Sequence, residues 1–217
     1  MIERAEEPER ASAAPARPAR IGIFGGTFDP VHIGHLAVAV NARYTLELDR
    51  VLLVVANEPW QKVGDRVVSD ARDRLAMVEE AVRPSPGVEA SAIEIERGGP
   101  SFTADTVAEL ARDNPGAELF VVVGADVVPG LAGWERIDDV RSGATLVVVN
   151  RPGSEVEKVG DLLAADGWRY AVIEVPALEV SSTDLRDRAA TGRPLDFLVP
   201  EGAIRVIRER ALYASER

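Results

Sequence analysis

The chain of 217 residues contains no cysteine and only two histidines. The first absence excludes a disulfide framework, a thiol nucleophile and a cysteine-ligated zinc site, and fits a reducing cytoplasm. No apolar run approaches the ~20 residues that a membrane-spanning helix requires, and the N-terminus lacks the apolar region of a secretory signal. We therefore expect a soluble, cytoplasmic protein without a membrane partner.

Basic residues are in the minority, with 25 Lys and Arg against 36 Asp and Glu. This balance argues against a nucleic-acid partner, whose binding depends on neutralising many phosphates. A small phosphorylated ligand remains compatible with it, because a few local donors and a helix N-terminus can hold such a ligand. The chain length suits one domain with a sizeable core and leaves homo-oligomerisation open.

The composition divides the chain into a tail and a domain. Residues 1–19 are nearly all Ala, Pro, Arg and Glu, which have little apolar surface to bury, so we expect a disordered tail. From Arg20 to Arg217 short β-branched runs alternate with amphipathic stretches. The expected strands are 21–24, 51–55, 88–95, 119–123, 145–149 and 171–175, and the expected helices are 33–47, 70–83, 103–113, 134–141, 183–190 and 201–211.

Several strands are apolar on both faces, which is typical of parallel strands covered by helices on each side. We therefore predict an α/β fold: a doubly wound, mostly parallel, Rossmann-like sheet with helices on both faces. Ligands of such sheets bind beyond the carboxyl ends of the strands.

A glycine-rich turn and both histidines follow the first expected strand. Gly25 and Gly26 let the backbone approach a phosphate, and the next helix start supplies free N–H groups. His32 and His35 share one helix face and can reach one ligand together. A lone Gly-Gly is usually a turn and a lone histidine usually packing, but their combination favours a functional site. Zinc is the competing interpretation, and two histidines without a third ligand make a poor zinc site.

A second candidate motif opens a helix near the C-terminus. Ser182, Thr183 and Arg186 follow the last expected strand, at the same sheet end as the histidines. A simple helix cap is the alternative interpretation of these residues.

The run Gly25-Gly-Thr-Phe-Asp-Pro-Val-His-Ile-Gly-His35 resembles the signature of the nucleotidylyltransferase superfamily, and Val180-Ser-Ser-Thr-Asp-Leu-Arg186 resembles its second signature. The resemblance implies a Rossmann-like sheet and an ATP site. The ATP-binding residues it implies are Gly25, Gly26, Thr27, Phe28, Gly124, Asp126, Ser182 and Thr183, with His32, His35 and Arg186 as catalytic residues. His32-Ile-Gly-His35 also spells the HIGH tetrapeptide of class I aminoacyl-tRNA synthetases, but neither their tRNA-binding domain nor their lysine-rich motif is present.

Three further segments resemble the nicotinate mononucleotide branch of this superfamily. Lys62 ends a Pro-Trp-Gln-Lys loop and would face a substrate phosphate, although Gln61 replaces the histidine often found before it. Gly98-Gly-Pro-Ser-Phe-Thr-Ala-Asp-Thr106 carries Phe102 in place of tyrosine, and the backbone near Thr103 would bind the nicotinate carboxylate. Trp134, after Gly124-Ala-Asp126, would stack on the pyridine ring.

The function that this resemblance implies is transfer of the adenylyl group of ATP to nicotinate mononucleotide, with release of pyrophosphate, in NAD biosynthesis. Mg²⁺ is expected to arrive with ATP, because no acidic cluster stands out as a dedicated metal site. Two alternatives stay open: another adenylyltransferase of the superfamily, such as phosphopantetheine adenylyltransferase, and a catalytically silent nucleotide-binding module.

Overall fold

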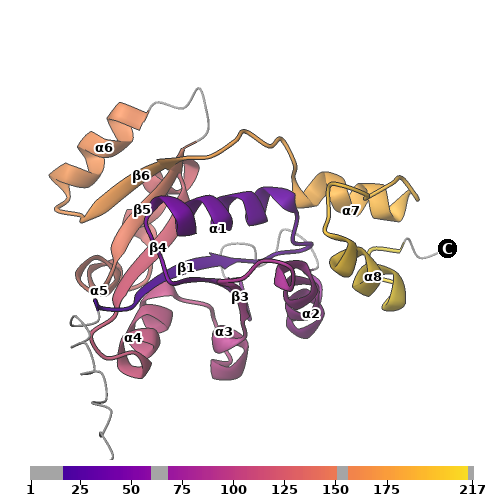
Figure 1. Ribbon diagram of the computed structural model, residues 1–217, viewed down its shortest axis with the longest axis horizontal. Helices are drawn as coiled ribbons and strands as arrows, with labels where there is room; N and C mark the ends of the chain where they lie inside the picture. The colour runs from indigo at the N-terminus through magenta and orange to yellow at the C-terminus, as the bar shows by residue number, and fades with distance from the viewer. Residues whose placement is uncertain (1–16, 60–67, 151–155, 215–217) are drawn as a thin grey trace, which may run out of the picture.

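The computed structural model describes residues 17–59, 68–150 and 156–214. In these ranges six parallel strands form one sheet in the order β3-β2-β1-β4-β5-β6. The strands are β1 (Arg20–Gly26), β2 (Arg50–Val55), β3 (Val88–Ser91), β4 (Glu118–Gly124), β5 (Thr145–Asn150) and β6 (Tyr170–Glu174). The chain starts in the middle, winds to one edge and then to the other, which confirms the predicted doubly wound, Rossmann-like sheet (Figure 1).

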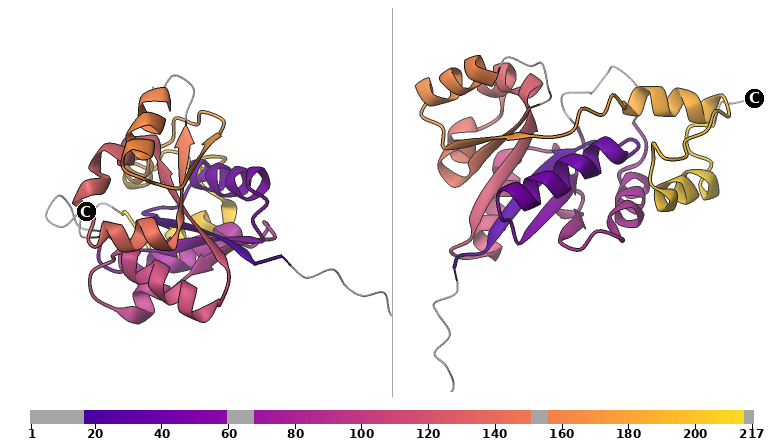
Figure 2. Two further views of the ribbon diagram at one scale, coloured as in Figure 1. Left: turned by 90° about the vertical axis from the view of Figure 1, so that its left-hand side faces the viewer. Right: turned by 45° about the horizontal axis from the view of Figure 1, so that its top comes forward.

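Helices cover both faces of this sheet (Figure 2). They are α1 (Ile33–Thr45), α2 (Ala71–Val82), α3 (Ile93–Arg97), α4 (Thr103–Asp113), the 3₁₀ helix η2 (Ala125–Gly133), α5 (Ile137–Gly143), α6 (Val156–Ala165), α7 (Ser182–Ala190) and α8 (Glu201–Glu209). Within the described ranges, none of them has the length and apolar character needed to cross a membrane.

Alternating side chains of each strand enter two separate cores. Leu53 and Val55 pack with residues of α1, α2 and α8 on one face, whereas Leu52 and Val54 pack with α4 and α5 on the other. All four are buried. Because both faces are covered, the strands need continuous apolar runs, which explains the Val-rich sequences from which they were predicted.

The sheet opens at the carboxyl end of β1. Pairing between β1 and β2 continues to Gly26 and Val55, whereas pairing between β1 and β4 ends at Ile23 and Val121. The winding direction also reverses between β1 and β4, and ligands of doubly wound sheets bind at such a reversal. The glycine turn after β1 and Gly124 at the end of β4 therefore border one crevice.

Two predicted elements differ from the structure. The strand expected over 88–95 ends at Ser91, and Ile93–Arg97 form the helix α3. β3 is an edge strand that pairs with β2 only as far as Ser91, so beyond it the alternating apolar pattern has no partner strand. The Oγ of Ser91 accepts from the N–H of Ile93 at 3.4 Å, where the chain leaves the sheet.

The helix expected over 134–141 begins only at Ile137. Trp134 ends the 3₁₀ helix η2 in an extended conformation, and Arg136 adopts a left-handed one before α5 starts. The helix α6 was not predicted, although a parallel pair such as β5 and β6 requires a crossover element between its strands.

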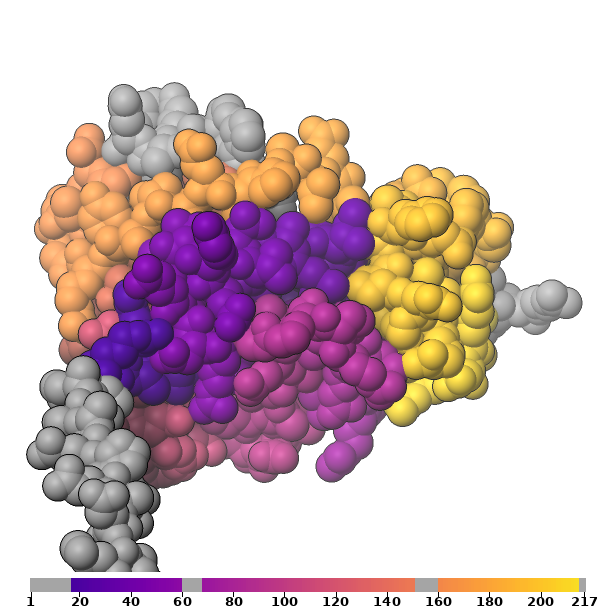
Figure 3. Space-filling view, in the orientation of Figure 1, coloured from indigo at the N-terminus to yellow at the C-terminus, as the bar shows by residue number. Residues whose placement is uncertain are grey.

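The C-terminal segment packs against the ends of α1 and α2, where Figure 3 shows it in yellow. α8 buries Ala203, Ile204, Val206 and Ile207 in the core that it shares with α2. This packing brings the end of the chain close to the loop after β1.

The last residues of the expected tail contact the domain. Arg17 forms an ion pair with Asp49 at 2.8 Å, and the backbone N–H of Arg20 donates to the same carboxylate at 2.7 Å. The Arg20 hydrogen bond, followed by that of Arg17, lowers the pKa of Asp49. The boundary at residue 19 remains a prediction, because residues 1–16 lie outside the described part of the chain.

Deletion of residues 2–18 should lower the melting temperature by no more than about 3 °C and leave activity unchanged. The ion pair that it removes is exposed on both sides, and exposed pairs contribute about 0–1 kcal/mol. Thermal unfolding of the full-length and truncated proteins measures this shift. A loss approaching 10 °C would show that the segment packs on the domain.

Candidate active site

The loop after β1 is shaped by a buried aromatic residue, Phe28. Its backbone is left-handed, with φ of 50°, and its ring makes edge contacts with Phe24 at 5.8 Å and with His35 at 5.0 Å. A Cβ on Gly26 would lie 2.8 Å from the Phe28 ring. Gly26 is therefore required by packing inside the loop.

The two histidines stack on one another at the start of α1, with ring centroids 3.7 Å apart. His32 is buried at the N-cap position, and its backbone N–H donates to Nδ1 of His35 at 3.2 Å. A neutral His35 that accepts at Nδ1 carries its proton on Nε2. A Cβ on Gly34 would come within 3.0 Å of His32 Nδ1, so the glycine between the histidines permits this stacking.

The second motif docks onto the first. Ser181 caps α7 by accepting from the N–H of Asp184 at 3.2 Å, so part of the motif is a helix cap. Ser182 Oγ donates to the carbonyl of Pro30 at 3.0 Å. Arg186 donates to the carbonyl of Asp29 at 2.7 Å and to Thr183 Oγ1 at 3.1 Å.

These elements border a cavity of about 630 Å³ on the α1 face of the sheet, which we call the α1-side cavity. Of the predicted residues it is lined by Gly25, Gly26, Thr27, Phe28, His32, His35, Gly124, Asp126 and Ser182. Arg186 is tied to the same loop, and Thr183 is tied to Arg186, but neither residue lines this cavity. A Cβ on Gly124 would collide with Oδ1 of Asp126, so this glycine leaves room for the carboxylate.

A second cavity of about 150 Å³ lies on the opposite face, beside α4, and we call it the α4-side cavity. This cavity is lined by Thr103, the first residue of α4, and by Trp134. The sequence motifs assign both residues to one substrate. N–H groups in the first turn of a helix have no intrahelical acceptor and favour anions. The two cavities share Gly25, Gly26 and Thr27, so they meet at the glycine turn.

The segment that carries Thr103 is fixed to the end of β2. The N–H of Asn57 donates to Ser101 Oγ at 2.8 Å, and the N–H of Ser101 donates to the carbonyl of Glu58 at 3.1 Å. The side chain of Asn57 also donates to the carbonyl of Gly99 at 3.0 Å. The wall of the α4-side cavity therefore depends on contacts across 40 residues of sequence.

Sequence reasoning missed Arg74, a buried residue that ties three segments together. It donates to the carbonyls of Ser69 at 2.8 Å, Thr27 at 2.9 Å and Asn57 at 3.2 Å. The available signal was its position on the apolar face of α2, three and four residues before the buried Met77 and Val78. An arginine on such a face needs buried acceptors.

Sequence reasoning also assigned no role to Tyr213, which holds the buried carboxylate of Asp29. Its hydroxyl donates to Asp29 Oδ1 at 2.7 Å, and the N–H of Ser69 lies 3.5 Å from Oδ2. Burial, followed by the charge of Asp29, raises the pKa of Tyr213, so the hydroxyl keeps its proton. Tyr213 thereby positions the loop of the first motif.

Two predictions concern residues or groups that the structure does not place. Lys62 lies outside the described residues. For magnesium, the described residues contain no group of three or more His, Asp or Glu side chains arranged to hold a metal ion.

Tyr213→Phe should destabilise the fold by about 1–3 kcal/mol, because Asp29 loses a buried donor. For a chain of this size the melting temperature should fall by roughly 3–10 °C. Tyr44→Phe is the matched control, since Tyr44 is 86% exposed. Equal melting temperatures for both variants would show that the hydroxyl contributes nothing to stability.

Known proteins resemble this chain over nearly its whole length. The family described as “Cytidylyltransferase-like” matches residues 23–188. A relative from Corynebacterium kroppenstedtii, named “Probable nicotinate-nucleotide adenylyltransferase”, is 43% identical over 194 residues, covering 89% of this chain and 90% of the relative. A relative of the same name from Streptomyces coelicolor is 42% identical over 193 residues, covering 89% of this chain and 100% of its own.

The fold is shared with more distant solved structures. The nicotinic acid mononucleotide adenylyltransferase of Plasmodium falciparum, solved with NaAD, superposes with a TM-score of 0.74 at 17% identity, covering 90% of this chain and 97% of that one. At this identity the likeness shows the fold alone, whereas the relatives near 40% identity span the motifs in both cavities. The chain therefore belongs to the nicotinate-nucleotide adenylyltransferases, within the cytidylyltransferase-like family.

Proposed function

We propose that this protein transfers the adenylyl group of ATP to nicotinate mononucleotide, producing nicotinate adenine dinucleotide and pyrophosphate for NAD biosynthesis. The observation that carries the proposal is the meeting of two cavities at Gly25, Gly26 and Thr27. A transfer between two bound nucleotides needs two sites whose phosphates meet at one point.

ATP is assigned to the larger, α1-side cavity. The amide groups of the glycine turn, with His32 and His35, would hold the reacting phosphates. Gly124 and Asp126 lie at the end of β4, on the other side of the crevice, where they would line the nucleotide. Ser182, Thr183 and the N-terminus of α7, with Arg186, would hold the departing pyrophosphate.

Nicotinate mononucleotide is assigned to the α4-side cavity. The first backbone N–H groups of α4, at Thr103, suit the nicotinate carboxylate, and Trp134 offers a flat surface for the pyridine ring. Lys62 is proposed, on the sequence alone, to face the substrate phosphate.

The reaction is an in-line displacement. A phosphate oxygen of nicotinate mononucleotide forms a bond to the α-phosphorus of ATP while the bond to the β-phosphate oxygen breaks and pyrophosphate leaves with that electron pair. The attacking phosphate monoester is already anionic at neutral pH, so no strong general base is required. The protein contributes positioning and donors aimed at the developing charge.

Magnesium is proposed to enter with ATP, bound to its phosphates, because the described residues offer no metal-binding cluster. We assign it no protein ligand. A cytoplasmic location is proposed from the absence of cysteine and from the nature of the substrates.

The deciding experiment offers three acceptors in turn to the purified protein with ATP and Mg²⁺: nicotinate mononucleotide, nicotinamide mononucleotide and 4′-phosphopantetheine. Pyrophosphate release should be fastest with the acid, exceeding the amide by more than about tenfold in kcat/KM, because an amide leaves a buried donor unmatched. Preference for phosphopantetheine would replace the proposed acceptor, and no release with any of them would favour a silent nucleotide-binding module.

His35→Asn should reduce kcat by ~10²–10³, the loss expected when one preorganised donor is removed. Asparagine retains an acceptor at the position of Nδ1 for the N–H of His32 and lacks only the Nε2 donor. His35→Ala removes both and should lose activity and stability together. Steady-state kinetics and thermal unfolding separate the two effects, and a fully active Asn variant would remove His35 from the catalytic assignment.

A further inference from the structure

A buried carboxylate, Glu94, lines the α4-side cavity together with Thr103 and Trp134. Its side chain is only 8% exposed. It comes from α3, the helix that replaces the end of the predicted strand. Because the acid substrate differs from its amide by one negative charge, a fixed carboxylate beside their common site should oppose the acid.

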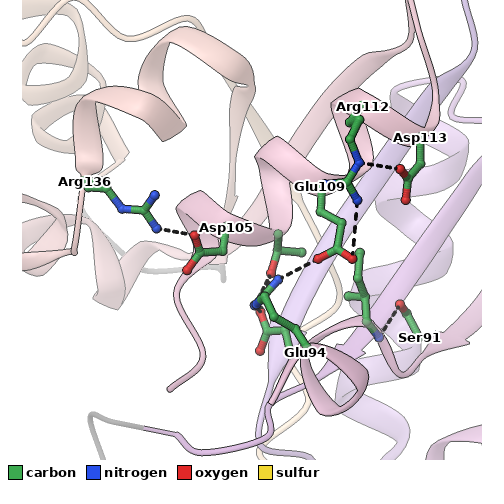
Figure 4. Close-up of polar contacts among 10 residues, drawn as sticks. Ser91, Glu94, Asp105, Glu109, Arg112, Asp113 and Arg136 are labelled. Carbon is green, nitrogen blue, oxygen red and sulfur yellow. Dashed lines mark hydrogen bonds and ion pairs between the residues drawn. The ribbon is translucent and has the colours of Figure 1, made fainter. Parts of the chain in front are cut away.

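Arg97 is the cation next to Glu94, which it reaches through Thr106, and it also forms a shorter ion pair with Glu109 at 3.1 Å. Thr106 Oγ1 donates to Glu94 Oε1 at 2.7 Å and accepts from Arg97 Nη2 at 3.2 Å. Arg97 Nη2 also lies 3.9 Å from Glu94 Oε1. Figure 4 shows Glu94 at one end of this network and Glu109 and Arg112 on α4, where Arg112 is 69% exposed.

The other described charged groups in or beside this cavity are more exposed or already paired. Glu135 lines it from an exposed position, where solvent screens its charge. Asp105 in the first turn of α4 is paired with Arg136. Among the described residues, Glu94 with Arg97 is therefore a buried charged feature of this cavity that can add to the N–H groups of α4 in distinguishing a carboxylate from a carboxamide.

We propose that Arg97 is a specificity-determining residue: by offsetting Glu94 it permits the α4-side cavity to accept an anionic ring substituent in place of a neutral amide. The proposal rests on the proposed function and concerns the choice between the acid and amide nucleotides. Arg97 acts through Thr106 and Glu94, so it is a positioning residue whose contribution is electrostatic.

The test measures kcat/KM for nicotinate and nicotinamide mononucleotides and compares their ratio among variants. Ribose, phosphate and the cationic ring are common to both substrates, so the ratio isolates the carboxylate. Arg97→Gln should lower the acid-to-amide ratio by about tenfold, because it removes a positive charge and leaves the buried Glu94 carboxylate to repel the carboxylate of the acid. Glu94→Gln should raise the ratio, and the double variant Glu94→Gln/Arg97→Gln should return it to within about threefold of wild type.

Two controls separate charge from structure. Arg97→Lys keeps the cation and should keep the ratio. Arg112→Gln removes the same charge from the outer end of the network, where the side chain is 69% exposed, and should leave the ratio unchanged. If Arg97 had only a structural role, Arg97→Gln would lower kcat/KM for both nucleotides alike, and Glu94→Gln would not raise the acid-to-amide ratio. If Arg97→Gln does not fold, the other two variants decide the proposal. The acid-to-amide ratio should rise in Glu94→Gln and should fall back toward the wild-type ratio in the double variant.

The outcomes also distinguish this inference from the proposed function. A wild-type protein that uses neither nucleotide contradicts the proposed function. A wild type that prefers the acid, with the same ratio in Arg97→Gln and Glu94→Gln, upholds the function and overturns the role of Arg97.

Discussion

The arrangement of the site depends on how the carbonyl groups of the loop Thr27–Pro30 are satisfied. The carbonyls of Thr27, Asp29 and Pro30 accept hydrogen bonds from Arg74, Arg186 and Ser182, respectively. Buried carbonyls require partners, and here two of the three receive charged donors. Since N–H and C=O point in opposite directions across a peptide plane, fixing the Thr27 carbonyl on the protein side also fixes the direction of the Phe28 N–H. These hydrogen bonds tie the loop to α2 and α7.

The donors to this loop come from α2 and α7, which are separated by about 100 residues of sequence. Tyr213, near the end of the chain, adds a hydrogen bond to Asp29 in the same loop. Packing of α8 on α2 brings that end into place. The contacts that join the C-terminal segment to the sheet therefore also shape the loop after β1, in which the first motif lies.

The sheet itself separates the two cavities to which the substrates are assigned. β1 stays paired with β2 to its end but leaves β4 after Ile23, and cavities form on both faces beside that gap. The glycine turn is common to both cavities, so the assigned phosphates can meet while the adenosine and nicotinate parts stay on opposite sides. The Glu94 carboxylate lines the α4-side cavity and does not line the α1-side cavity.

Local patterns in the sequence determined the strands, most helices and the position of both motifs. The apolar runs that become β2, β4 and β5 are buried on two faces, and His32 to His35 open α1 as predicted. The family follows from the same motifs and from relatives that span the chain. The roles of individual site residues, and that of Lys62, stay predictions.

Tertiary structure decided what depends on partners distant in sequence. The alternating pattern over 88–95 indicated a strand, but an edge position without a partner beyond Ser91 turned its second half into α3 and placed Glu94 in a cavity. Trp134 was assigned to a helix, and the turn that ends η2 instead directs it to the same cavity. Arg74 and Tyr213 acquire their roles only from acceptors brought to them by folding. Periodicity reports which face of an element is apolar, whereas a buried charge is tolerated only where the rest of the chain supplies its hydrogen bonds.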